Sequence, residues 1–128
     1  MNRILIDTNI YSNALRGNNE VVAVLQRASL IGISAISIGE LYSGFLAGTR
    51  EKTNREELDQ FLDSPRVVIY PADESTAEYY SSTLNQLKSQ GTPIPTNDIW
   101  IAATAFQHGL QLYTLDNHFH HIKGLLLR

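Results

Sequence analysis

Short apolar runs alternate with longer segments of helical periodicity along this chain. The runs are bounded by turn-forming residues, a pattern typical of buried strands. We predict strands at Arg3–Ile6, Ile33–Ala35, Val67–Tyr70 and Leu110–Leu115, with a fifth at a sheet edge over Leu125–Leu127. Strands that alternate with helices favour a mostly parallel sheet covered on both faces, which binds ligands beyond the carboxyl ends of its strands.

Six helical segments are predicted between these strands. They end at Leu15, near Gly32, and at Ala47, Leu62, Gln90 and Gly109. Two of them begin at sequences that fit a capping box, Ser37 with Glu40 and Thr53 with Glu56. The segment 91–96 carries two prolines and is predicted to be a loop that delivers Asn97 and Asp98 to the start of the last helix.

The size and composition of the chain fit one domain over residues 1–128. Of its 128 residues, 43% are hydrophobic, which is enough to bury a core without covalent crosslinks. The absence of cysteine excludes disulfides and thiolate metal sites. The apolar run before Asp7 is too short for a signal sequence or a membrane span, so we expect a cytoplasmic protein.

Four acidic residues lie where predicted strands or helices begin or end: Asp7, Glu40, Asp98 and Asp116. A fold that gathers these ends gathers four carboxylates. Two carboxylates about 5 Å apart repel by roughly 3 kcal/mol at an effective dielectric near 20, so such a cluster takes up protons or binds a cation. Hard oxygen ligands favour Mg²⁺ or Mn²⁺.

The formal net charge of −3 argues at first against a nucleic-acid partner, because phosphate binding rests on an excess of Lys and Arg. The four acids account for that sign. Without them the count is −3 + 4 = +1, and one bound dication would bring the intact protein from −3 to −1. Charge therefore leaves RNA open as a partner.

Each acid also has a purely structural interpretation. Asp7 fits a helix cap, Glu40 fits the capping box with Ser37, Asp98 fits a cap of the last helix, and Asp116 fits an ordinary turn. Strand alternation would place Thr114 on the same side as Asp116, where it could orient what Asp116 holds. Both interpretations stay open at the level of single residues.

Two of the acids lie on helix faces made of small residues. These faces contain Gly44 and Ala47 beside Glu40, and Ala102 and Ala105 beside Asp98. Small side chains leave open volume in which a solvated carboxylate can meet other groups. This space favours a functional site over a cap.

The four histidines lack the partner cysteines or the HExxH spacing of a zinc site. We interpret His120 and His121 as part of a surface loop. Trp100 lies outside the Asp98 face of its helix, and we interpret it as a packing or subunit contact.

Four segments in order resemble the PIN-domain family, and most closely the VapC-type toxins of bacterial toxin–antitoxin modules. They are Ile4–Asn9, Ile36–Leu41, Asn97–Ala103 and Thr114–Phe119. The resemblance covers nearly the full length. It implies a PIN-like three-layer α/β fold, with a mostly parallel sheet of four to five strands flanked by helices.

The resemblance also implies a function. It is that of a Mg²⁺- or Mn²⁺-dependent endoribonuclease, the toxin of a toxin–antitoxin pair, which cleaves structured RNA such as tRNA or rRNA. Such proteins form a homodimer and a hetero-oligomer with a cognate antitoxin that inhibits them. By motif match, the catalytic and metal-binding residues are Asp7, Glu40, Asp98 and Asp116, supported by Asn9 and Thr114. Asp116 is the weakest match.

We expect Asp7 and Asp98 to ligate the metal directly, and Glu40 and Asp116 to act through metal-bound water or as the base that receives its proton. Three alternatives stay open: a ribonuclease of RNA processing without an antitoxin, a metal-dependent RNA-binding domain that does not cut, and a receiver-like domain. The last expects an Asp at the end of the third strand, where this chain has Tyr70 and Pro71.

Overall fold

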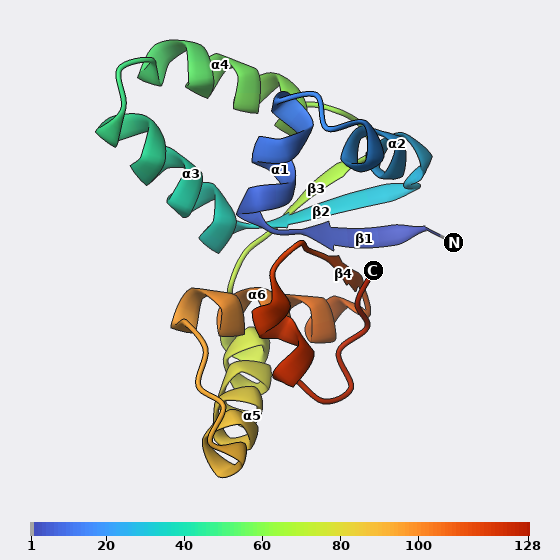
Figure 1. Cartoon of the computed structure of the whole chain (residues 1–128), viewed down its shortest axis with the longest axis vertical. Helices are drawn as coiled ribbons and strands as arrows, with labels where there is room; N and C mark the ends of the chain where they lie inside the picture. The colour runs from blue at the N-terminus through green and yellow to red at the C-terminus, as the bar shows by residue number, and fades with distance from the viewer. Residues whose placement is uncertain (1) are drawn as a thin grey trace.

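The computed structural model describes residues 2–128 and has a sheet of four strands at its centre (Figure 1). The strands are β1 (Arg3–Ile6), β2 (Leu30–Ser34), β3 (Val67–Tyr70) and β4 (Gln111–Tyr113), in the spatial order β3-β2-β1-β4. Every pair of neighbouring strands is parallel. The predicted parallel sheet is therefore confirmed.

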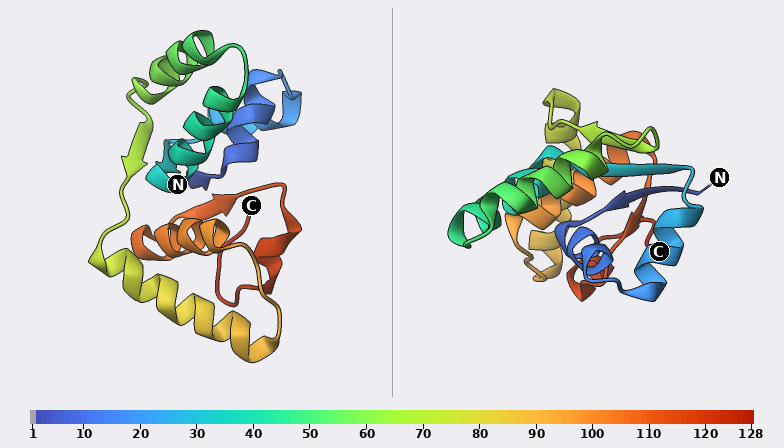
Figure 2. Two further views of the ribbon diagram at one scale, coloured as in Figure 1. Left: turned by 90° about the vertical axis from the view of Figure 1, so that its left-hand side faces the viewer. Right: turned by 90° about the horizontal axis from the view of Figure 1, so that it is seen from above.

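Helices cover both faces of the sheet (Figures 1 and 2). One layer contains α1 (Thr8–Leu15), α2 (Asn19–Arg27), α3 (Ala35–Ala47) and α4 (Glu51–Leu62), and the other contains α5 (Glu74–Gln90), α6 (Thr96–His108) and the short 3₁₀ helix η1 (Asn117–His121). This three-layer α/β arrangement is the one predicted. Within residues 2–128, no helix has the length and apolar character needed to cross a membrane.

The central strand β1 explains why both layers adhere to the sheet. Alternate residues of a strand point to opposite faces. Ile4 and Ile6 pack into the core beneath α1 to α4, whereas Leu5 packs into the core that α5 and α6 cover. All three side chains are fully buried, so β1 anchors two hydrophobic cores at once.

The register of β1 brings distant parts of the chain to one edge of the sheet. Ile6 at its carboxyl end pairs with Ile33 of β2 and with Tyr113 of β4. The residues that follow these strands, including Asp7 and Thr114, therefore start their loops and helices side by side. This edge is where a parallel sheet places its ligands.

Both predicted capping boxes are wrong. The hydroxyl of Ser34 caps α3 by accepting from the Ile36 amide at 3.0 Å, so the helix begins at Ala35, and Ser37 is buried within it. Glu40 therefore takes no part in capping α3. Likewise, α4 begins at Glu51, two residues before Thr53, without a side-chain cap.

The carboxyl-terminal strands are shorter than predicted. β4 ends at Tyr113, and the run Leu125–Leu127 is reduced to one parallel bridge between Leu112 and Leu127. Two backbone bonds hold it, from the Leu112 amide to the Leu126 carbonyl at 2.7 Å and from the Arg128 amide to the Leu112 carbonyl at 2.9 Å. The sheet therefore has four strands and a bridged tail.

Candidate metal centre

A pocket of about 400 Å³ opens at the carboxyl ends of β1 and β4. All four acids predicted from the sequence line it: Asp7, Glu40, Asp98 and Asp116. They come from the start of α1, from α3, from the start of α6 and from the start of η1. The fold thus brings together four carboxylates that are spread over more than a hundred positions of the chain.

Asp7 is both a helix cap and a wall of the pocket. Its Oδ1 accepts from the Ile10 amide at 3.1 Å and caps α1, while its Oδ2 accepts a short hydrogen bond from the Thr114 hydroxyl. The residue is only 5% exposed. The structural and functional interpretations of Asp7 are therefore compatible.

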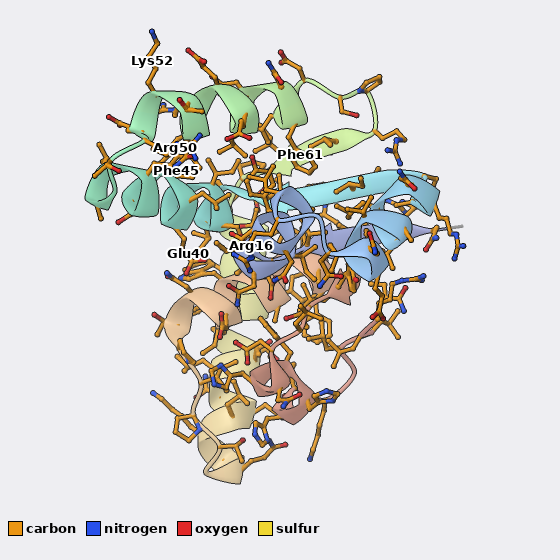
Figure 3. All side chains as sticks on the ribbon, turned by 45° about the horizontal axis from the view of Figure 1, so that its top comes forward. Arg16, Glu40, Phe45, Arg50, Lys52 and Phe61 are labelled. Carbon is orange, nitrogen blue, oxygen red and sulfur yellow. The ribbon has the colours of Figure 1, made fainter. Side chains whose placement is uncertain are left out.

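Glu40 connects three helices at the rim of the pocket. Its side chain leaves α3 on the side that faces α6 (Figure 3). One carboxylate oxygen accepts from the Thr8 hydroxyl at 2.8 Å, and the other accepts from the Asn97 amide group at 3.4 Å. These bonds hold Glu40 in the pocket. Its two partners lie 32 and 57 positions away from it in the sequence.

Asp98 does not cap its helix. The helix α6 starts after Pro95 without a side-chain cap, so the interpretation of Asp98 as its cap is wrong. The carboxylate of Asp98 instead lies 3.2 Å from the Nδ1 atom of His118. It is therefore available to the pocket.

Asp116 caps the 3₁₀ helix η1 by accepting from the His118 amide at 2.9 Å. Its own amide donates to the Thr114 hydroxyl oxygen at 2.9 Å. Thr114 therefore joins Asp116 to Asp7, and its role in supporting the acids stays a prediction. The predicted cause, strand alternation through Thr114, is wrong because β4 ends one residue earlier.

The pKa values of two acids show the cost of gathering these charges. Burial raises the pKa of Asp7, against the hydrogen bonds from Thr114 and Ile10, and the charges of Asp98 and Asp116 raise it further. Burial is also the largest cause that raises the pKa of Asp98. No lysine or arginine lines the pocket within residues 2–128. The pocket is therefore suited to a cation.

His118 is the pocket residue that the sequence interpretation missed. Its Nδ1 lies 3.2 Å from an oxygen of Asp98 and 3.2 Å from an oxygen of Asp116. The ligand atoms of these three residues lie within 4.8 Å of one another. The available signal was its position two residues after Asp116. His120 and His121 are exposed, as predicted, although they belong to η1.

The two small-residue faces differ in a way that the sequence did not indicate. Gly44 and Ala47 line a groove of about 710 Å³ that shares Glu40 and Asn97 with the pocket. Ala102 and Ala105 are instead buried in the core beneath α5 and α6. The prediction of open space beside Asp98 on its own helix face is therefore wrong.

Two other predicted residues lie as follows. Asn9 is exposed and lines the pocket, and its role in supporting the acids stays a prediction. Trp100 stacks on Tyr80 of α5, with ring centroids 4.1 Å apart. Its interpretation as a packing residue is confirmed.

The family model for the PIN domain matches residues 4–125. The chain belongs to the PIN-domain family. This membership excludes the receiver-like alternative and confirms the resemblance drawn from the four sequence segments.

Relatives with known names support the same assignment. The chain is 38% identical over 121 residues to Toxin FitB of Neisseria gonorrhoeae, a match that covers 88% of this chain and 87% of FitB. It is 31% identical over 88 residues to Ribonuclease VapC4 of Mycobacterium tuberculosis, which covers 69% of this chain and 68% of VapC4.

Solved structures agree in fold. VapBC2 from Rickettsia felis, bound to a DNA fragment from its promoter, matches with a TM-score of 0.89 and 27% identity over 98% of this chain and 96% of that one. FitAcB from Neisseria gonorrhoeae matches with a TM-score of 0.77 and 31% identity over the same shares. The fold is thus that of VapC-type chains.

Proposed function

We propose that this chain is a divalent-metal-dependent endoribonuclease and the toxin of a toxin–antitoxin pair. The observation that carries the proposal is the pocket in which Asp7, Glu40, Asp98 and Asp116 meet, with no lysine or arginine among its lining residues in the described part of the chain. Membership of the PIN family and relatives named as ribonuclease and toxin support it. Mg²⁺ and Mn²⁺ suit these oxygen donors.

The donor set fits such an ion. Asp98 and Asp116 present oxygens close enough to share one cation, and Asp7 lies beside them with its carboxylate oriented by Thr114 and Ile10. Direct ligation by Asp7 and Asp98, with Glu40 and Asp116 acting through water, remains our proposed division of roles. The proximity of Asp116 to Asp98 strengthens the weakest of the four assignments.

The chain's own residues prepare phosphodiester hydrolysis. A bound dication supplies a water of lowered pKa and positive charge toward the scissile phosphate. Glu40, held by Thr8 and Asn97 at the pocket rim, would act there as the base that accepts a proton. The groove along Gly44 and Ala47 continues from the pocket and gives an RNA strand a path lined mostly by small side chains.

The proposed substrate is structured RNA, such as tRNA or rRNA, and the proposed partner is an antitoxin. Related solved structures are VapBC and FitAcB assemblies. Homodimerisation, a hetero-oligomer with the antitoxin and a cytoplasmic location stay predictions. A processing ribonuclease without an antitoxin is the second candidate, because the metal pocket alone fits both roles.

Cleavage of purified tRNA and rRNA fragments tests the enzymatic part. We expect internal cuts with Mn²⁺ or Mg²⁺, loss of cutting in EDTA and recovery with excess Mn²⁺. Asp98→Asn should be inactive, whereas Asp59→Asn, the same change at an exposed position of α4, should cut normally. Cleavage that survives chelation would refute the metal-dependent mechanism.

Expression in cells tests the toxin role. The wild-type chain should arrest growth, and Glu40→Gln or Asp98→Asn should relieve the arrest. Co-expression with the product of a neighbouring small gene should give a stable complex that does not cut RNA. If expression is harmless while the purified protein cuts RNA, and no partner co-purifies from the native host, the processing role is the correct one.

A further inference from the structure

His118 brings an imidazole nitrogen into a pocket whose acidic lining consists of Asp7, Glu40, Asp98 and Asp116. Its Nδ1 lies 3.2 Å from oxygens of both Asp98 and Asp116. The backbone holds this position, because the His118 amide donates to Asp116 and the Asp116 amide donates to Thr114. The imidazole is therefore placed by the same hydrogen bonds that place a carboxylate of the site.

These distances match those of donors that share one ion. Two ligand atoms at about 2.1–2.2 Å from a metal and at right angles to each other are separated by about 3 Å. The Nδ1 atom meets that spacing toward Asp98, a proposed direct ligand, and lies equally close to Asp116, whose proposed contact with the metal runs through water. Half of the His118 side chain is exposed, so the ring can adjust to an ion without disturbing a packed core.

We propose that Nδ1 of His118 is a ligand of the metal and makes the site prefer Mn²⁺ to Mg²⁺. This inference rests on the proposed metal-dependent function and adds a residue that determines metal choice. Imidazole nitrogen suits transition metals, whereas Mg²⁺ is served by oxygen ligands and water. A mixed donor set of two carboxylates and one imidazole therefore favours the softer ion.

A competing role for the ring gives the opposite result. His118 could instead act as an imidazolium that neutralises Asp98 and Asp116 and leaves when a metal enters. Removal of the ring would then raise the affinities for Mn²⁺ and Mg²⁺ together. Removal of a ligand lowers the Mn²⁺ affinity selectively, so the sign of the change separates the two roles.

Electron spin-echo spectroscopy of the full chain loaded with Mn²⁺ tests ligation directly. We expect modulation from a coupled ¹⁴N nucleus, its replacement by the ¹⁵N pattern in protein grown with ¹⁵N-histidine, and its loss in His118→Ala. His120→Ala removes an exposed imidazole from the same short helix and should retain the modulation. Absence of nitrogen coupling in the wild-type protein would overturn the proposal.

Calorimetric titration with each metal alone tests the preference. His118→Ala and His118→Gln should lower the Mn²⁺ affinity about tenfold or more, a loss of the size found when the ligand environment of a metal is damaged. The Mg²⁺ affinity should change much less. Equal losses for both ions, or gains for both, would contradict the proposal, and thermal unfolding in EDTA shows whether each variant is folded.

Neither measurement contains RNA, so the two proposals fail in different ways. Nitrogen coupling and selective Mn²⁺ loss in a protein that never cuts RNA would overturn the nuclease function and leave the His118 assignment standing. Metal-dependent RNA cleavage without nitrogen coupling would support the nuclease function and overturn the assignment of His118 as a ligand.

Discussion

The two walls of the pocket hold their carboxylates in different ways. On the wall at the strand ends, Asp7 and Asp116 each cap a helix, and Thr114 hydrogen-bonds to both residues. On the helix wall, Glu40 and Asp98 cap no helix and bond only to side chains at the pocket. The first wall is part of the structural framework, and the second is attached to it.

This difference teaches that the same residue type has opposite effects on stability within one site. A carboxylate that caps a helix stabilises it through hydrogen bonds and the helix dipole. A carboxylate without that role has only side-chain partners in the pocket to set against the cost of burial and of repulsion in the metal-free protein. Substitutions on the two walls should therefore separate function from stability.

Asp98→Asn should have the largest effect, on the response to metal. Mn²⁺ at a hundred times its dissociation constant stabilises a protein by about 2.7 kcal/mol. Asp98→Asn should abolish most of that gain, because it removes a charged oxygen donor from the pocket. Thermal unfolding with and without Mn²⁺ measures the effect, with Asp59→Asn as the control. An undiminished metal response would remove Asp98 from the site.

Asp7→Ala should destabilise the metal-free protein by about 1–2 kcal/mol relative to Asp7→Asn. Alanine loses the cap on the Ile10 amide and leaves the Thr114 hydroxyl without its acceptor, whereas asparagine keeps an acceptor for the cap. Urea unfolding in EDTA gives the difference. RNA cleavage by Asp7→Ala should be reduced at least as much as by Asp116→Ala, and the reverse order would mean that the direct ligands are misassigned.

Thr114→Val should cost about 1 kcal/mol of stability and also weaken metal binding. The hydroxyl orients Asp7 and accepts from the Asp116 amide, so both carboxylates lose a fixed position. Thr104→Val is the matched control, since its buried hydroxyl donates within α6 to the Trp100 carbonyl at 2.9 Å. Equal metal affinities in the two variants would show that Thr114 is only structural.

The smallest effect concerns pH. Because the pKa of Asp98 is raised above its ordinary value of 3.8, the folded state binds this proton more tightly than the unfolded state. The charge of Asp98 therefore lowers stability as pH rises from about that value through the raised pKa. In EDTA, Asp98→Asn should be more stable than the wild type at neutral pH, and this advantage should disappear in acid. A stability difference between Asp98→Asn and the wild type that does not change with pH would show that the charge of Asp98 is not its cause.

The order of elements could be predicted because its signals are local. Val67–Tyr70 and Glu74–Gln90 were predicted with the bounds that the structure has, since β-branched runs and helical spacing need no distant partner. The proximity of the four acids could also be predicted from the sequence, because a parallel sheet brings the carboxyl ends of its strands to one edge. The predictions that failed concern polar side chains whose hydrogen-bond partners are distant in the sequence.

Glu40 and His118 illustrate that limit. Ser37 and Glu40 have the spacing of a capping box, but Ser34 caps the helix first and Glu40 bonds to Thr8, 32 positions away. His118 turns into the pocket because a cap by Asp116 sets the course of η1. Neither bond leaves a periodic signal in the sequence.

The pairing of β1 with β4 also sets when the site can exist during synthesis. Asp7 emerges among the first residues, but Thr114, which orients it, follows 107 positions later. Chains are made from the amino end at about 5–20 residues per second, so this contact waits on the order of ten seconds. A nascent chain that has not yet presented β4 also lacks Asp116 and His118, which follow it, so translation delays assembly of the pocket until almost the whole chain has been made.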